Sequence, residues 1–234
     1  MLLYIIRHGH PDYTTDTLTE RGWAQAESVG RRIASARIDR IFSSPMGRAR
    51  QTAEPAARLL GLPVTIEDWT HEIGDERKTN CPYNDFRSIS LVPNYIFREG
   101  GDIELPYSAQ LESKVIRESR MDEALEYISN SGDGFLERLG YKNEGGIYRI
   151  LRPSEERVAL FCHSAFARAW LSVLLHIPVH MMWSDFNYTF TGVTVLEFNN
   201  FESGFTSPRC LCYSDMSHLY KDGPDMIYDG GIEL

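Results

Sequence analysis

Two histidines and two arginines occupy positions that favour chemistry. The apolar segment LLYIIR runs directly into His8 and Gly9, and a later apolar segment, RVALFC, runs into His163. Arg7 precedes His8, and Arg48 lies in the segment SPMGRARQTAE. A neutral imidazole can attack phosphorus, a second, cationic imidazole can hold charge on the transferring oxygens, and arginine forks match phosphate oxygens two at a time. Together these residue types predict a pocket for a phosphoryl group.

The charge balance of the chain requires that such a pocket be local. The 234 residues contain 24 Lys and Arg against 33 Asp and Glu, which gives a net charge of −9. An acidic chain is a poor partner for nucleic acid or for an anionic membrane surface, and we expect neither. The predicted partner is a small phosphorylated substrate, and the oligomeric state is left open.

The elements that must position these residues alternate between strand and helix. Apolar runs predict strands, and apolar residues at helical spacing predict helices between them. We expect strands at 2–6, 40–44, 62–68, 157–163, 190–198 and 208–214, and helices at 18–38, 44–61, 121–140 and 164–175. This order predicts one α/β domain over 1–234, a three-layer α/β/α sandwich with a mostly parallel sheet.

Capping residues give the expected helix boundaries. Thr19 is the predicted N-cap of the first helix. In the second, Ser44 is the predicted N-cap, Pro45 the first helical residue and Gly61 the stop. Pro55 should kink or split that helix.

Residues 76 to 120 interrupt this alternation. The stretch is turn-rich, and we expect it to form an inserted cap segment over the site. Tyr83, Phe86 and Tyr95 in this segment are expected to affect substrate choice more than chemistry.

The predicted topology brings the reactive residues together. Ligands of open α/β sheets bind beyond the carboxyl ends of the strands, which is where His8 and His163 stand. Arg48 lies near the start of a helix, whose free N–H groups add positive character. The leaving group needs a proton, and Glu72, Asp75 and Glu76 follow the third strand.

The segments IIRHGHPDYTTDTLTERGWAQAE, FSSPMGRARQTAE and ALFCHSAFARAWL resemble the signatures of the histidine phosphatase superfamily, also called phosphoglycerate-mutase-like. The similarity covers roughly residues 1–75 and 157–198. It implies His8 as the nucleophile, with Arg7, Arg48 and His163 forming the phosphate pocket. Glu72 stands where members of the family carry the carboxyl that protonates the leaving group.

Three further residues follow from the same resemblance. Thr14 stands near the family's phosphate-binding asparagine and could donate a hydroxyl. Ser164 replaces the glycine that usually follows the second histidine, and it retains a backbone N–H. His10 could line the substrate entrance. The loop before LTERG is shorter than in the mutases, which favours a phosphatase over a cofactor-dependent phosphoglycerate mutase.

Two other classes of function match part of the sequence. HGHPD has the H-x-H-x-D spacing of binuclear metallohydrolases, but Tyr13 stands where that pattern continues with histidine, and Arg7 would repel a metal ion. A catalytically inactive phospho-ligand binder has the same core residues. We expect an active enzyme that uses neither metal nor cofactor.

Composition also suggests the compartment. The four cysteines are Cys81, Cys162, Cys210 and Cys212, and they form no CxxC pair or secreted disulfide framework. The apolar run at 1–6 is too short for a signal peptide or a membrane span. These features predict a cytoplasmic protein.

Overall fold

The computed structural model describes residues 1–234 except 74–91, 93, 120, 223–227, 230–231 and 234. Its centre is a six-stranded sheet in the order β11-β9-β1-β8-β4-β5. These strands are β1 (Leu2–Arg7), β4 (Arg40–Ser43), β5 (Val64–Ile66), β8 (Arg157–Cys162), β9 (Val193–Glu197) and β11 (Arg209–Asp215). All six expected strands are therefore confirmed.

The sheet is mostly parallel, as predicted. β1 pairs with β8 in parallel, β8 with β4, and β4 with β5, whereas β9 runs antiparallel to both β1 and β11. In the register of the central pair, Arg7 lies opposite Cys162. His8 and His163 therefore leave the sheet at the same level and on the same edge.

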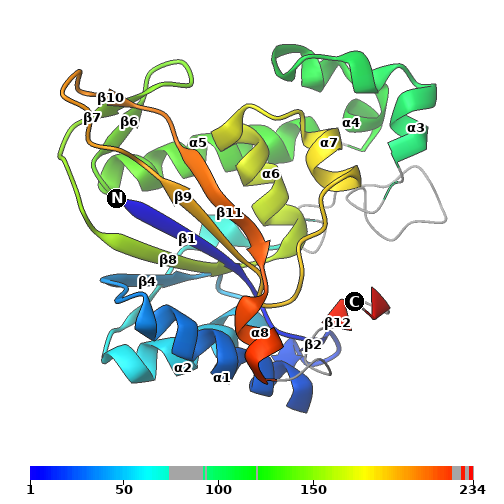
Figure 1. Cartoon of the computed structure of the whole chain (residues 1–234). Coiled ribbons are helices and arrows are strands. Elements are labelled where there is room, and N and C mark those ends of the chain that lie inside the picture. The colour runs from blue at the N-terminus through cyan, green and yellow to red at the C-terminus, as the bar shows by residue number, and fades with distance from the viewer. Residues whose placement is uncertain (74–91, 93, 120, 223–227, 230–231, 234) are drawn as a thin grey trace.

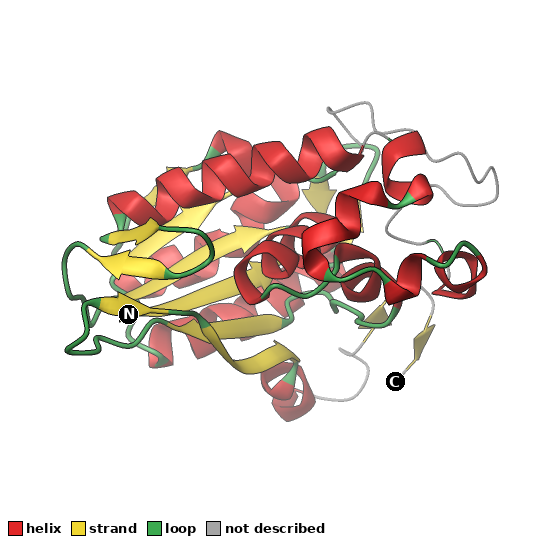
Figure 2. Cartoon of the chain, turned by 90° about the horizontal axis from the view of Figure 1, so that it is seen from above, coloured by secondary structure: helices red, strands yellow, loops and turns green. Residues whose placement is uncertain are grey.

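Helices cover both faces of this sheet (Figures 1 and 2). α1 (Glu20–Ser35) and α2 (Gly47–Leu60) lie on one face, and α5 (Met121–Arg138) and α6 (Ser164–Leu175) on the other. Alternate strand residues enter two separate apolar clusters. Leu3, Ile5, Leu160 and Cys162 pack toward α5 and α6, whereas Ile6, Ala159, Phe161 and Val193 pack toward α1 and α2. The strands are apolar throughout because both faces are buried.

The helix boundaries confirm some cap predictions and correct others. Thr19 caps α1, its side chain accepting a hydrogen bond from the N–H of Gly22, and Gly61 ends α2 in the left-handed conformation. Ser44 is not the N-cap of α2, because the helix begins at Gly47 with Met46 as its cap residue. Ser44 instead contacts the site described below.

α2 also continues through Pro55 as one helix, so the predicted split is wrong. Pro55 packs against Gly30 of α1, where an added Cβ would lie 2.7 Å from the proline side chain. Gly30 therefore leaves space for the proline ring between the two helices.

Several short elements complete the described chain. The helices are α3 (Asn94–Glu99), α4 (Lys114–Glu118), α7 (Val179–Ser184) and α8 (Ser217–Asp222), with 3-10 turns at η1 (Asp68–Thr70), η3 (Asp102–Glu104) and η4 (Tyr107–Glu112). β6 (Tyr141–Asn143), β7 (Tyr148–Ile150) and β10 (Phe205–Thr206) form a small sheet that the sequence did not reveal. β2 (Pro11–Asp12) pairs with β3 (Thr17–Leu18), and β12 (Tyr228–Asp229) with β13 (Ile232–Glu233).

The expected insertion lies partly outside the described residues. Asp75, Glu76, Tyr83 and Phe86 belong to the part that is not described, whereas 94–118 consists of short helices that pack against α5 and α7. Tyr95 on α3 is 54% exposed. Whether this segment acts as a cap stays a prediction.

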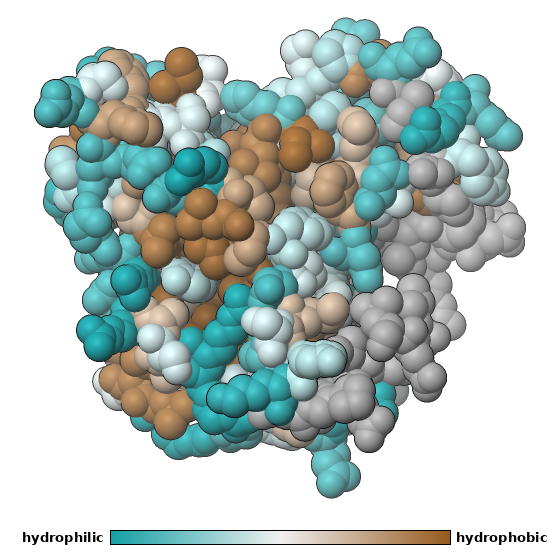
Figure 3. Space-filling model, viewed as in Figure 1, coloured by the Kyte–Doolittle hydropathy of each residue, from teal (hydrophilic) through white to brown (hydrophobic). Residues whose placement is uncertain are grey.

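Apolar side chains are exposed along one edge of the central sheet. Figure 3 shows apolar side chains over the edge strand β11, where Leu211 is 47% exposed. No helix within the described part of the chain is long and apolar enough to cross a membrane.

Candidate active site

The two histidines meet beyond the carboxyl ends of β1 and β8. The ring centroids of His8 and His163 are 5.2 Å apart, with an interplanar angle of 57°. Both side chains are buried, at 1% and 0% exposure. The parallel pairing of their strands brings together residues that lie 155 positions apart, counted from the sequence.

The contacts of His8 define its tautomer. Its Nδ1 lies 2.7 Å from the carbonyl oxygen of Gly9, which can only accept, so Nδ1 carries the proton. Its Nε2 receives a hydrogen bond from Nε of Arg48 at 3.3 Å and therefore carries the lone pair. A neutral imidazole with its lone pair on the ring atom beside an arginine is prepared for nucleophilic attack on an anion.

Burial and nearby charge favour the neutral form of both rings. Desolvation, followed by the positive charges of Arg7 and Arg48, lowers the pKa of His8 well below its usual range. Desolvation and the neighbouring His8 and Arg48 do the same to the pKa of His163. The cationic second imidazole expected from the sequence would therefore require a bound anion to stabilise its charge.

Arg48 is held from two sides. Its guanidinium is 3% exposed, and its NH1 group donates to the carboxylate of Asp16, while Nε donates to His8. The same carboxylate accepts a hydrogen bond from the N–H of Gly47 at 2.6 Å. Asp16 thus binds both the first residue of α2 and the arginine that follows it. Nothing in the sequence pattern marked Asp16 for this role.

Arg7 packs against an aromatic ring that the sequence reasoning also missed. Its guanidinium lies 3.9 Å from the ring centroid of Phe190 and donates to the carbonyl of Tyr188. The Phe190 ring also contacts His8, with centroids 5.6 Å apart. Phe190 is 3% exposed, so it fixes the positions of Arg7 and His8 from the segment before β9.

Two side-chain hydroxyls, of Ser44 and Thr52, form hydrogen bonds with residues of this site. Oγ of Ser44 lies 2.8 Å from Nε2 of His163 and accepts from the N–H of Met46 at 3.3 Å. Oγ1 of Thr52 accepts from the N–H of Gly9 at 3.0 Å. Nδ1 of His163 is buried and has no hydrogen-bond partner among the described residues.

Glu72 lies at the N-terminus of α6, the helix that begins directly after His163. Its Oε1 accepts from the N–H of Phe166 at 2.9 Å and from that of Ile73 at 3.0 Å, and Oε2 accepts from the N–H of Ala165 at 3.3 Å. The carboxylate is therefore fixed beside the second histidine. Oε2 makes the longer, weaker contact. Asp75 and Glu76, the alternative acids, lie outside the described residues.

Two glycines of these motifs, Gly9 and Gly22, are required for steric reasons. A Cβ on Gly9 would lie 2.7 Å from the carbonyl oxygen of Gly22, and a Cβ on Gly22 would lie 2.1 Å from that of His10. The loop after β1 and the first turn of α1 therefore touch through backbone atoms. This close contact requires glycine both at position 9 and at position 22.

Of the three remaining predicted residues, His10 and Ser164 adjoin this cluster, whereas Thr14 does not. His10 packs edge-on against Phe190, with centroids 5.4 Å apart, and its Nδ1 lies 2.9 Å from Oγ1 of Thr19. Ser164 is the first residue of α6, so its N–H has no partner within the helix. Thr14 is exposed, and its hydroxyl donates to Asp12 at 2.6 Å instead of joining the cluster.

The three side chains of the H-x-H-x-D pattern do not converge on one point. His8 faces Gly9 and Arg48, His10 contacts Thr19, and the Asp12 carboxylate accepts from two threonine hydroxyls. Over the described residues, no group of three or more His, Cys, Asp or Glu side chains is arranged to hold a metal ion.

Comparison with known protein families identifies the family of this chain. The sequence pattern of the histidine phosphatase superfamily (branch 1) matches residues 3–135, more than half of the chain. The protein belongs to this superfamily, as the resemblance in the motifs implied.

The fold is that of solved phosphatases. A phosphoserine phosphatase from Entamoeba histolytica, crystallised with 3-phosphoglyceric acid, superposes with a TM-score of 0.62 at 20% identity, over 93% of this chain and 98% of that one. A mycobacterial glucosyl-3-phosphoglycerate phosphatase superposes with a TM-score of 0.61 at 19% identity, over 91% of this chain and 98% of that one.

Curated relatives match only in part. A probable phosphoglycerate mutase GpmB from Photorhabdus laumondii is 32% identical over 80 residues, which is 30% of this chain. The match spans 37% of the length of that relative. The family and the fold together support an enzyme of the phosphatase or mutase type.

Proposed function

We propose that this protein hydrolyses a small phosphomonoester through a phosphohistidine formed on His8, without a metal ion. The observation that carries the proposal is the orientation of the His8 ring. Nδ1 is held by the carbonyl of Gly9, the lone pair on Nε2 faces the buried Arg48, and the centroid of the His163 ring lies 5.2 Å from that of His8. A histidine with only a structural role would not need its lone pair directed at a buried arginine.

The first step transfers the phosphoryl group. Nε2 of His8 attacks phosphorus, the N–P bond forms, and the bond from phosphorus to the ester oxygen breaks. Arg7, Arg48 and His163 stabilise the charge on the three non-bridging oxygens. The leaving oxygen takes a proton from Glu72, which enters this step in its acid form and leaves it as a carboxylate.

The second step returns the enzyme to its starting state. A water molecule gives a proton to Glu72 and attacks phosphorus, and the N–P bond breaks. Inorganic phosphate leaves, and the Nε2 lone pair of His8 is restored. Atoms and charges balance over the two steps, so no further reactant is needed.

The substrate class follows from similarity and remains part of the proposal. The solved relatives are named for phosphoserine and for glucosyl-3-phosphoglycerate, which carry a carboxylate as well as a phosphate ester. We propose a small phosphorylated metabolite of this general kind. Phosphoglycerate mutase activity is the second candidate, favoured by the partial match to probable mutases and disfavoured by the short loop between His10 and Leu18.

The test is to trap the intermediate. Purified enzyme is mixed with a phosphate-labelled aryl phosphate, quenched in base, and the labelled residue is identified by mass spectrometry. We expect an acid-labile, base-stable label on His8, and no label and no turnover in His8→Ala. His176→Asn, a substitution at an exposed position that ends α6, is the matched control and should label normally.

Two further measurements separate the alternatives. Activity should survive EDTA and dialysis, because side chains supply the positive charge. Loss of activity on chelation with recovery on adding zinc would instead favour a metallohydrolase. Phosphate release from 2- or 3-phosphoglycerate should exceed interconversion of the two isomers, and faster interconversion would assign the protein to the mutases. Label on Ser164, or no label with hydrolysis intact, would refute the phosphohistidine mechanism.

A further inference from the structure

Arg168 is a buried arginine of α6 that the proposed reaction does not use. It is 5% exposed and lies one turn after Ser164, the first residue of the helix. Its Nε donates to the carbonyl of Ser164 at 3.2 Å, and its NH1 group donates to the carbonyls of Trp183 at 2.7 Å and Phe186 at 3.2 Å. A guanidinium presents its donors in a rigid plane, so these contacts fix the start of α6 relative to the end of α7 and the segment that follows it.

The segment that this arginine binds forms one wall of the candidate active site. Residues 185–192 connect α7 to β9, and two of them contact the first arginine of the site. The carbonyl of Tyr188 accepts from the guanidinium of Arg7, and the ring of Phe190 lies 3.9 Å from the guanidinium carbon. The hydroxyl of Tyr188 donates to the carbonyl of Ile5 at 2.9 Å. The tyrosine ring is thus anchored on β1, whereas the position of its carbonyl depends on the backbone that leads to it.

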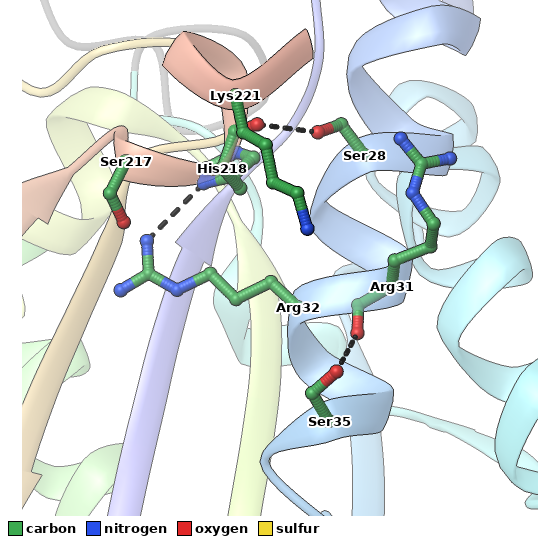
Figure 4. A pocket seen from close by; sticks show the side chains of 7 residues that line it. All are labelled: Ser28, Arg31, Arg32, Ser35, Ser217, His218 and Lys221. Carbon is green, nitrogen blue, oxygen red and sulfur yellow. Dashed lines mark hydrogen bonds between the residues drawn. The ribbon is translucent and has the colours of Figure 1, made fainter.

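The two ends of this segment are held by different helices. At the far end, Nε2 of His218 on α8 lies 3.1 Å from Oγ1 of Thr191, and Arg32 on α1 donates to Nδ1 of the same ring at 3.2 Å (Figure 4). At the near end, Arg168 holds Phe186, two residues before the tyrosine carbonyl described above. The position of that carbonyl therefore depends on α6.

The same helix carries the other half of the site. α6 begins directly after His163, and N–H groups of its first turn hold the carboxylate of Glu72. Trp183 adds a second link to α7, because its Nε1 donates to the carbonyl of Ala165 at 3.2 Å. The guanidinium of Arg168 therefore joins the half of the site with the second histidine and the acid to the half with the arginine of β1.

We propose that Arg168 is a positioning residue for phosphate binding, which fixes the Tyr188 carbonyl and, through that carbonyl, the guanidinium of Arg7. The inference rests on the proposed function, because it assigns Arg7 to the phosphate oxygens. Loss of the link would let residues 185–188 move relative to α6 and would take the Arg7 guanidinium out of alignment with the phosphate. Binding and transfer should both suffer, since that charge acts in the ground state and in the transition state.

A double-mutant cycle tests whether Arg168 acts through Arg7. The measurement is the dissociation constant of inorganic phosphate, followed at constant ionic strength by the amide resonance of Gly9 in the full chain. Arg168→Met removes the donors and should weaken phosphate binding by about tenfold, comparable to the cost of one lost buried hydrogen bond. The same substitution in an Arg7→Gln background should change the dissociation constant by less than about twofold, because the residue through which it acts is absent.

Two single variants accompany the cycle. Arg168→Lys keeps a cationic donor for the carbonyl of Trp183 and should bind phosphate within about threefold of wild type. Arg152→Met, the matched control, removes an exposed arginine that also donates to a backbone carbonyl, that of Arg138 at 3.4 Å. It should leave phosphate binding unchanged. Thermal unfolding checks that every variant folds, and Arg168→Gln replaces Arg168→Met in the cycle if the latter does not fold.

Turnover separates this role from proton donation. In Arg168→Met, Glu72 keeps its hydrogen bonds to the first turn of α6, so kcat should fall by the same factor on an alkyl and on an aryl phosphate. A larger loss on the alkyl phosphate would mean that Arg168 acts on the acid instead of on Arg7, and would overturn the proposal.

Three further results would overturn it: wild-type phosphate affinity in Arg168→Met, equal weakening by that substitution in the wild-type and Arg7→Gln backgrounds, and a loss in Arg168→Lys as large as in Arg168→Met. The cycle needs only bound phosphate, so it does not depend on a phosphohistidine. Absence of label on His8 with the coupling intact would refute only the catalytic proposal, whereas label on His8 without coupling would refute only the role of Arg168.

Discussion

Arg48 donates a hydrogen bond from Nε to Nε2 of His8 at 3.3 Å, so a buried arginine faces the lone pair of the proposed nucleophile. Its NH1 group is meanwhile held by Asp16 on the other side. A guanidinium can serve both partners because its donors form a planar fork, whereas an ammonium group acts as a single point charge. Position and orientation of this charge, as well as its sign, should therefore matter to transfer.

The first prediction follows from this geometry. Arg48→Lys keeps the charge but loses the fork, and kcat/KM on an aryl phosphate should fall by about 10²–10³-fold, as for loss of one preorganised donor. Arg50→Lys, at an exposed position two residues later on α2, should behave as wild type. Thermal unfolding of both variants checks that they fold. Activity of Arg48→Lys within about threefold of wild type would show that charge alone suffices.

The second prediction concerns Glu72 and depends on the leaving group. Proton donation contributes about 10²–10⁴-fold in reactions of this kind. Glu72→Gln should therefore slow hydrolysis of an alkyl phosphate by a factor in that range and that of an aryl phosphate much less, since an aryl leaving group needs little protonation. The measurement is kcat on both substrates.

The matched control for Glu72 is Asp68→Asn, an exposed carboxylate four residues earlier. It should leave both rates unchanged. Equal losses on the two substrates in Glu72→Gln would mean that the residue supports α6 and the pocket instead of donating a proton. The acid would then be sought at Asp75 or Glu76.

The third prediction is a dependence of stability on pH. Burial lowers the folded-state pKa of His8 and of His163 below 6.5, the ordinary value that applies when the chain is unfolded. As pH falls below 6.5, the unfolded chain takes up protons that the folded chain does not. Their contribution to stability is thus complete above pH 6.5 and is lost below it, by about 1.4 kcal/mol per pH unit for each histidine.

Urea unfolding at several pH values measures this slope. The double variant His8→Gln with His163→Gln should have a shallower fall in unfolding free energy between pH 6.5 and about pH 5 than wild type. His176→Asn removes an exposed histidine and should retain the wild-type slope. Identical slopes in wild type and the double variant would show that the buried rings titrate normally.

The sequence predicted the fold because each main strand carries a strong local signal. β1 and β8 are continuous apolar runs, and the helices between them have clear apolar faces. The small sheet of β6, β7 and β10 was missed because its strands are only two or three residues long. An alternating pattern is not detectable over such lengths.

The sequence predicted the site residues that follow strand ends. It missed the residues that contact the site from distant parts of the chain. His8 and His163 end strands, so topology alone placed them together. Phe190 packs on Arg7 from 183 positions away, counted from the sequence, and no local pattern signals that contact. Ser44 matched a helix cap in sequence, but α2 begins only at Gly47 and the Ser44 hydroxyl contacts His163.

The fourth prediction concerns a chain of hydrogen bonds that ends at the backbone of His8. Arg32 donates to Nδ1 of His218, so the proton of that ring is on Nε2, which lies 3.1 Å from Oγ1 of Thr191. The N–H of Thr191 donates to the carbonyl of His8 at 3.2 Å. Thr191 has a φ of 55°, a left-handed conformation that is unfavourable for a β-branched residue and must be held by its contacts.

His218 should therefore act as a positioning residue for His8. His218→Leu removes both hydrogen bonds, and kcat on an aryl phosphate should fall by about tenfold, comparable to the cost of one lost buried hydrogen bond. His218→Gln keeps a donor for Thr191 and an acceptor for Arg32, and it should retain most of the wild-type rate. If the two variants lose kcat equally, or if His218→Leu lowers only the unfolding temperature, His218 stabilises the fold without positioning the nucleophile.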